Sequence, residues 1–79
     1  MGNIQSMKNE KYNLLREELT KLNIPSEYYS IGIDREEKLC VIENDGIWSV
    51  FYRERGNKSN LYEFDDFNEM KKKLIDILV

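Results

Sequence analysis

The 79-residue sequence contains no histidine, one cysteine and one proline. Without histidine, it lacks the side chain that most often transfers protons or activates a nucleophile near neutral pH. It also lacks a CxxC pair and a glycine-rich phosphate loop. The adjacent pair Asp65 and Asp66 is explained by helix capping without any catalytic role. We therefore expect no catalytic residues, no metal site, no cofactor and no enzymatic activity.

The single cysteine, Cys40, lies between Leu39 and Val41, where a free thiol behaves as a small core residue. A lone cysteine excludes an internal disulfide and is typical of proteins that stay in a reducing compartment. No stretch of the sequence is apolar and long enough to cross a membrane, and its start does not have the pattern of a signal peptide. These observations predict a cytoplasmic protein with no membrane partner.

The charge is mildly acidic and unevenly distributed. Twelve basic residues stand against 15 acidic ones, a net charge of −3. Residues 23–46 carry six acids and two bases, whereas residues 47–60 carry three bases and one acid. Opposite charge favours a basic partner for the acidic segment. The length predicts a single domain over residues 1–79, in which residues 1–7 form a flexible leader.

Residues 38–64 predict a β-meander. Three runs rich in β-branched and aromatic residues are separated by residues that suit tight turns. The runs are residues 39–42, 47–52 and 61–64. The turns, at residues 44–46 and 56–60, contain Gly, Asn and Asp, which tolerate positive φ or bond their own backbone.

Two helices and a further strand surround the meander. Apolar residues recur at helical spacing over residues 8–22, and Asn23 followed by Pro25 is expected to end this helix. Residues 27–33 predict a first strand. Asp66 is expected to cap a final helix, with Glu69 completing a capping box. The predicted fold is α+β in the order α-β-β-β-β-α, an antiparallel sheet packed with N- and C-terminal helices.

The placement of the two helices stays open. The predicted strands do not alternate cleanly between apolar and polar residues, as strands covered on one face should. One face receives Trp48, Val50 and Tyr52, and the other receives Ile47 and Phe51. The helices either divide between the faces or share one face and leave an apolar, aromatic surface for a partner.

The segment from Trp48 to Lys58, WSVFYRERGNK, followed by Leu61 and Phe64, resembles a pattern in small bacterial immunity proteins. These proteins belong to polymorphic and contact-dependent growth inhibition toxin systems. In the pattern, a tryptophan strand leads into a Glu-Arg-Gly turn, a short strand ending in Phe and an acidic helix start. The likeness covers about half of the chain, residues 37–78.

The resemblance implies a cytoplasmic protein that binds the C-terminal domain of one cognate toxin, commonly a nuclease, and neutralises it without catalysis. It does not assign contact residues, so these are predicted from chemistry. Four acids on turns at the two ends of the second strand are expected to engage a basic cleft and speed association. These acids are Glu36, Glu37, Glu43 and Asp45. Trp48 and Tyr52 are expected to act as aromatic anchors if their face is open, and as core residues otherwise.

A structural role is predicted for the turn residues Glu54, Arg55 and Gly56. Gly56 is expected to allow the backbone conformation of the turn, and Arg55 to form a pairing interaction that holds the turn. The alternative function is a small nucleic-acid-binding or regulatory adaptor domain, because the element order resembles the double-stranded RNA-binding domain. The lysines at residues 71–73 come late in the final helix, and the acidic total opposes phosphate contact. A homodimer through the open sheet face is a third possibility.

Overall fold

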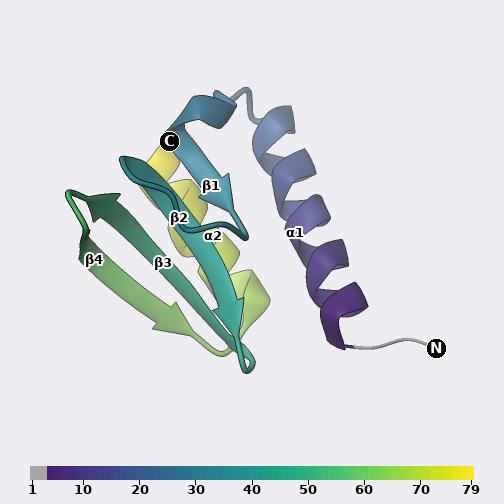
Figure 1. Ribbon diagram of the computed structural model, residues 1–79. Coiled ribbons are helices and arrows are strands. Elements are labelled where there is room, and N and C mark those ends of the chain that lie inside the picture. The colour runs from purple at the N-terminus through teal and green to yellow at the C-terminus, as the bar shows by residue number, and fades with distance from the viewer. Residues whose placement is uncertain (1–3) are drawn as a thin grey trace.

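Figure 1 shows the computed structural model, which describes residues 4–79. The order of the helices and strands along the chain confirms the predicted α+β arrangement. The elements are α1 (Ile4–Lys21), a short 3₁₀ helix (Ser26–Tyr28), β1 (Tyr29–Ile31), β2 (Lys38–Asn44), β3 (Ile47–Glu54), β4 (Asn57–Phe64) and α2 (Phe67–Leu78). Of the leader predicted for residues 1–7, residues 1–3 lie outside the described residues, and residues 4–7 belong to α1 instead.

The end of α1 follows the sequence prediction. Asn23 adopts a φ of 61°, and its N–H donates to the Thr20 carbonyl at 2.9 Å. The N–H of Ile24 donates to the Leu19 carbonyl at 3.1 Å. This pair of bonds is a Schellman motif, which satisfies carbonyls that the helix leaves free. Ile24 then packs against the core, so the motif also fixes where the chain leaves the helix.

The strands β2, β3 and β4 form the predicted antiparallel meander. Each hairpin has a turn with positive φ at both central residues, as type I′ turns require. These residues are Asp45 (52°) and Gly46 (84°) in the first turn, and Arg55 (51°) and Gly56 (80°) in the second.

The second turn is shorter than predicted. It was expected over residues 56–60, but β4 begins at Asn57. The residues that suggested a longer turn instead accommodate an irregularity in the pairing of β4 between Val50 and Tyr52. Asn60, with a φ of 54°, lies in this stretch. An edge strand that is broken in this way is a poor template for uncontrolled pairing with another chain.

Both helices pack on the same face of the sheet, which we call the inner face. One buried cluster joins residues from both helices to residues from all of the first three strands. Its members are Tyr12, Leu15, Leu19, Ile31, Leu39, Val41, Trp48, Val50, Met70 and Leu74. Figure 1 shows α2 behind the sheet. The opposite, outer face therefore has no helix over it.

The first strand differs from the prediction in length and direction. Residues 26–28 form a 3₁₀ turn, so β1 is limited to Tyr29–Ile31, and it pairs with β2 in parallel rather than antiparallel. Gly32, with a φ of 84°, turns the chain directly after β1. Residues 32–37 then return across the outer face. This connection can be short because β1 itself has only three residues.

Tyr12 of α1 joins the helix to the sheet. Its hydroxyl accepts a hydrogen bond from the Glu43 N–H at 2.9 Å, beyond the last residue pair between β1 and β2. Its ring meets Trp48 edge to face, with centroids 5.6 Å apart, and Trp48 meets Phe67 of α2 at 5.1 Å. Such aromatic pairs stabilise beyond their buried area. One aromatic row thus connects α1, β3 and α2.

The start of α2 confirms Asp66 as the predicted cap: its carboxylate accepts a hydrogen bond from the Glu69 N–H at 3.1 Å. The Glu69 side chain does not return a bond to the Asp66 N–H, so the predicted capping box is not completed. Met70 and Leu74 are fully buried, and Phe67 and Leu78 are half-buried beside them, which defines the inward side of the helix. No helix within residues 4–79 combines the length and apolar character needed to cross a lipid bilayer.

Alanine at Gly32 is expected to destabilise the fold more than alanine at Gly46. Both glycines have a φ of 84°, so both substitutions carry the strain of a side chain at positive φ, about 1–2 kcal/mol. At Gly32 the new Cβ would also lie 3.0 Å from the Tyr12 ring, whereas nothing lies within 4 Å at Gly46. Overpacking adds about 1–3 kcal/mol. Urea unfolding of the two variants checks this, and equal losses would contradict the close approach to Tyr12.

Replacing Tyr12 with Phe is expected to lower the free energy of unfolding by about 1–2 kcal/mol. The ring contacts remain, but the Glu43 N–H loses its acceptor. Tyr28→Phe is a suitable control, because the Tyr28 side chain is exposed. If both variants unfold at the same urea concentration, the hydroxyl bond has no role in holding α1.

Candidate functional site

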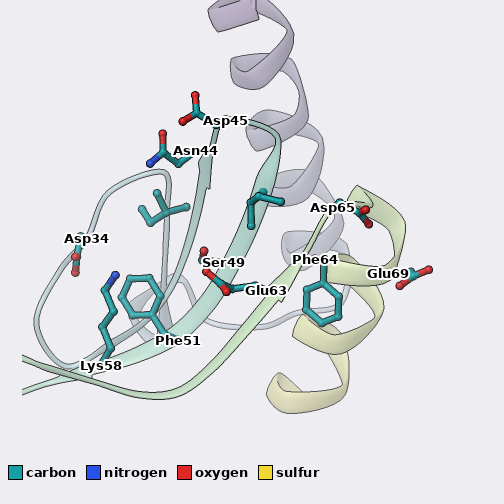
Figure 2. A pocket seen from close by; sticks show the side chains of 12 residues that line it. Asp34, Asn44, Asp45, Ser49, Phe51, Lys58, Glu63, Phe64, Asp65 and Glu69 are labelled. Carbon is teal, nitrogen blue, oxygen red and sulfur yellow. The ribbon is translucent and has the colours of Figure 1, made fainter.

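The outer face contains an open groove of about 760 Å³, which we call the outer groove (Figure 2). It extends from the loop after β1, across β2 and β3, to the end of β4 and the first turn of α2. Its lining residues are Asp34, Ile42, Asn44, Asp45, Ile47, Ser49, Phe51, Lys58, Glu63, Phe64, Asp65 and Glu69.

The floor of the outer groove is formed by Ser49 and three apolar residues, Ile42, Ile47 and Phe51. Strand register places Ile42 opposite Ser49, and the same alternation directs Ile47 and Phe51 to this face. Ile47 is 38% exposed, whereas Phe51 is only 1% exposed at the bottom of the groove. Phe64 pairs with Trp48 and packs against the core from the inner side, so it reaches the groove only at its β4 edge (Figure 2). Ile42, Ile47 and Phe51 face outward, and neither helix covers this side of the sheet.

The rim of the groove is acidic. Five of its lining residues are carboxylates, against one cation, Lys58. The carboxylates come from five places in the fold: the loop after β1, the β2–β3 turn, β4, the link to α2 and the first turn of α2. They are Asp34, Asp45, Glu63, Asp65 and Glu69. Figure 2 shows them around the groove with Lys58 near Asp34.

The loop of residues 32–37 closes one end of the groove. Asp34 accepts two hydrogen bonds from the Arg53 guanidinium, one of them from Nε at 2.9 Å. The Glu36 carboxylate accepts from the Gly56 N–H at 3.0 Å, and the Glu37 N–H donates to the Arg53 carbonyl at 2.6 Å. The hydrogen bond from Arg53 holds the pKa of Asp34 below its ordinary value of 3.8. This loop is therefore tied to the β3–β4 hairpin.

Cys40 lies beneath this loop and is fully buried, as its apolar sequence neighbours predicted. Its Sγ is 3.4 Å from both the N and the O of Arg35. Burial raises the pKa of the thiol above its ordinary value. The thiol is thus held in the uncharged, unreactive form, which is the structural role expected for it.

The predicted acidic contacts do not form one surface. Glu36 and Glu37 lie at the closed end, where Glu36 binds the Gly56 N–H. Glu43 is turned to the inner side: its carboxylate accepts from the Gly46 N–H at 2.7 Å and lies 3.5 Å from Lys8 Nζ. Of the four predicted acids, only Asp45 lines the outer groove.

Trp48 and Tyr52 do not lie on an open face, as their predicted role as aromatic anchors required. Trp48 is 4% exposed between α1 and α2, and Tyr52 is half-buried against the same core. Both project from the inner face, since Trp48 pairs with Glu43 and Tyr52 with Leu39. Both are core residues. On β3 the outward aromatic side chain is that of Phe51, which is 1% exposed.

The predicted structural turn lies where expected, at the tip of the β3–β4 hairpin between Glu54 and Asn57. Its stabilising pair differs from the prediction. Arg53, rather than Arg55, binds the Gly56 carbonyl through Nη1 at 2.9 Å and also binds Asp34. Within residues 8–79, Arg55 forms no ion pair.

Sequence reasoning missed most of the residues that make the groove. Asp65 and Glu69 were interpreted only as part of a helix cap, and Ile42 and Glu63 were not singled out. A usable signal was present: a two-residue turn at Asp45 fixes the register of β2 and β3 and directs Ile42 outward with Ile47. The position of β4 required the second turn, whose length was predicted incorrectly.

No group of three or more potential metal ligands is assembled within the described part of the chain. Comparison with known proteins adds no assignment: no protein-family model, curated protein or solved structure was found to match this chain.

The bond between Asp34 and Arg53 predicts a pH-dependent loss of stability. Folding lowers the pKa of Asp34, so the bond stabilises the fold fully at pH values above the ordinary pKa of 3.8. This stabilisation is lost as the pH falls through the lowered pKa. Asp34→Asn should lower the melting temperature at pH 7 but leave it unchanged near pH 2. Glu10→Gln, which removes one exposed carboxylate from α1, serves as a control. A difference that persists at pH 2 would contradict this assignment.

Proposed function

We propose that this chain is an immunity protein that binds the C-terminal domain of one cognate bacterial toxin and neutralises it in the cytoplasm. In this proposal it acts by protein–protein contact alone and has no catalytic activity of its own. The observation that carries the proposal is the outer face, where no helix covers the sheet and a hollow with a partly apolar floor is surrounded by carboxylates. A concave surface on which polar groups converge is typical of a binding site.

The charge of the outer groove supports a nuclease as the toxin. A nuclease cleft must attract phosphate groups and is therefore basic. An acidic groove is complementary to such a cleft, and long-range attraction speeds the association of the two proteins. Fast association suits an inhibitor that must act before its target cleaves nucleic acid.

The construction of the groove also supports a binding role. Its floor residues stand on β2 and β3, and its rim includes the first turn of α2. The backbone of regular elements is already ordered before binding, so little backbone entropy is lost in the complex. The bonds from Asp34 and Glu36 fix the remaining loop.

The alternative nucleic-acid-binding function has less support. The carboxylates of the groove would repel phosphates. On α2, Lys71 lies 5.9 Å from the Phe67 ring and Lys73 lies 4.4 Å from the Tyr62 ring. These lysines belong to the helix side and not to the open face. A homodimer through the outer face would place one acidic rim against another, which charge repulsion opposes.

The proposal predicts that the gene immediately upstream encodes the toxin domain, and that domain is the partner used to test it. Co-expression should restore growth of cells that produce the toxin, and the purified, nuclease-treated proteins should form a complex of equal stoichiometry. Ser49→Arg places a cation and a large side chain on the groove floor. We expect it to weaken binding at least about tenfold, or 1.4 kcal/mol, and to remove protection.

Asn9→Arg is the matched control, because it adds the same charge at an exposed position of α1. It should protect as the original chain does, and melting temperatures should show that both variants fold. Protection by Ser49→Arg would reject the outer face as the binding surface. Absence of any complex with the original chain would reject the immunity function itself.

A further inference from the structure

We infer that the outer groove receives a basic segment of its protein partner in one orientation. The cationic side chains of this segment lie over Asp45, Glu63, Asp65 and Glu69, which we call the acidic end, and its uncharged part points toward Asp34 and Lys58. The inference rests on the proposed function only in taking the occupant to be a protein.

The carboxylates of the acidic end are available for a partner. All four are exposed. Within residues 8–79, none of them forms an ion pair; the carboxylates that do are Glu18, Asp34 and Glu43. Four unneutralised carboxylates around one hollow produce a concentrated negative potential. A cation that binds there would replace repulsion among these groups by attraction.

The opposite end of the groove is already neutralised. The charge of Asp34 is matched by Arg53 through two hydrogen bonds. The Lys58 ammonium lies 4.7 Å from the centroid of the Phe51 ring, which is a favourable position for a cation. A second cation at this end would meet Lys58 and Arg53, and the one carboxylate of this end that lines the groove, Asp34, is already bound to Arg53. The contrast between the two ends determines the orientation.

The floor suits the stems of basic side chains. Ile47 is partly exposed, and Ile42 is half-buried on the same face. Lysine and arginine place their aliphatic stems along apolar surfaces while their charged groups reach polar partners. Arginine suits the acidic end better, because its planar guanidinium donates to two carboxylates at once and is less strongly hydrated than an ammonium.

Charge also selects among the possible occupants. A second copy of this chain would bring a second acidic end against the first, and like charges in contact are destabilising. A nucleic acid would bring phosphates to the same carboxylates. A basic protein segment is the occupant for which both the rim and the floor have complementary groups.

The probe for this inference is a short peptide, capped at both ends, of two arginines, one leucine and two serines. Nuclear magnetic resonance titration should shift the backbone amides of residues 42–49 and 63–69. A nitroxide on the arginine end should broaden the amides of Asp45 and Asp65 most strongly, and a nitroxide on the serine end those near Lys58. The reverse pattern would overturn the orientation, and shifts confined to the helices would overturn the site.

Charge-removing variants separate specific binding from general attraction. Glu63→Gln with Asp65→Asn should weaken peptide binding about fivefold, as expected for two exposed ion pairs. Glu10→Gln with Glu27→Gln removes the same charge from exposed positions outside the groove and should change binding less than about twofold. Equal weakening by the two pairs would show that net charge alone attracts the peptide.

The two proposals fail in different ways. If the chain binds its toxin but not the peptide in the groove, the inference is wrong and the immunity function stands. If the peptide binds as described but no toxin is recognised, the immunity function is wrong and the chemistry of the groove stands.

Discussion

The contact between Tyr12 and the sheet is the constraint on which the other features depend. Its hydroxyl accepts from the Glu43 N–H where β1 has already ended, so a helix side chain takes over a position that a longer strand would occupy. The same ring requires a glycine at position 32 and supports Trp48. A chain of 79 residues has room for only one core. Once α1 and α2 both serve that core from the inner face, the outer face is free for binding.

The parts of the fold that the sequence predicted correctly are those determined by neighbouring residues. Asn23 ends α1 by a local pair of backbone bonds, and Asp66 caps α2 through an N–H three residues away. The direction of β1 was predicted incorrectly, because it depends on contacts between distant segments. Residues 27–33 alternate like a longer strand, and only the close approach of Gly32 to Tyr12 reveals why the chain must turn there.

The candidate site was predictable only in its general chemistry. An acidic and aromatic surface was expected, but three of the four predicted acids lie outside the groove. Two of these, Glu36 and Glu43, accept hydrogen bonds from backbone N–H groups of turns. The acids of the groove come from segments that are separate in the sequence and meet only when the register of β4 is known. In a strand, a change of one position reverses the face. This is why Trp48 and Tyr52 are core residues while Ile47 and Phe51 face the groove.

The order of the strands in the sheet is the same as their order in the chain, from β1 to β4 (Figure 1). Each strand therefore pairs with its sequence neighbour, and little chain entropy is lost in bringing the partners together. Pairing between sequence neighbours is associated with rapid folding. Under the proposed immunity function, folding time sets part of the interval between synthesis of the inhibitor and protection of the cell. A topology of local strand pairings would shorten that interval.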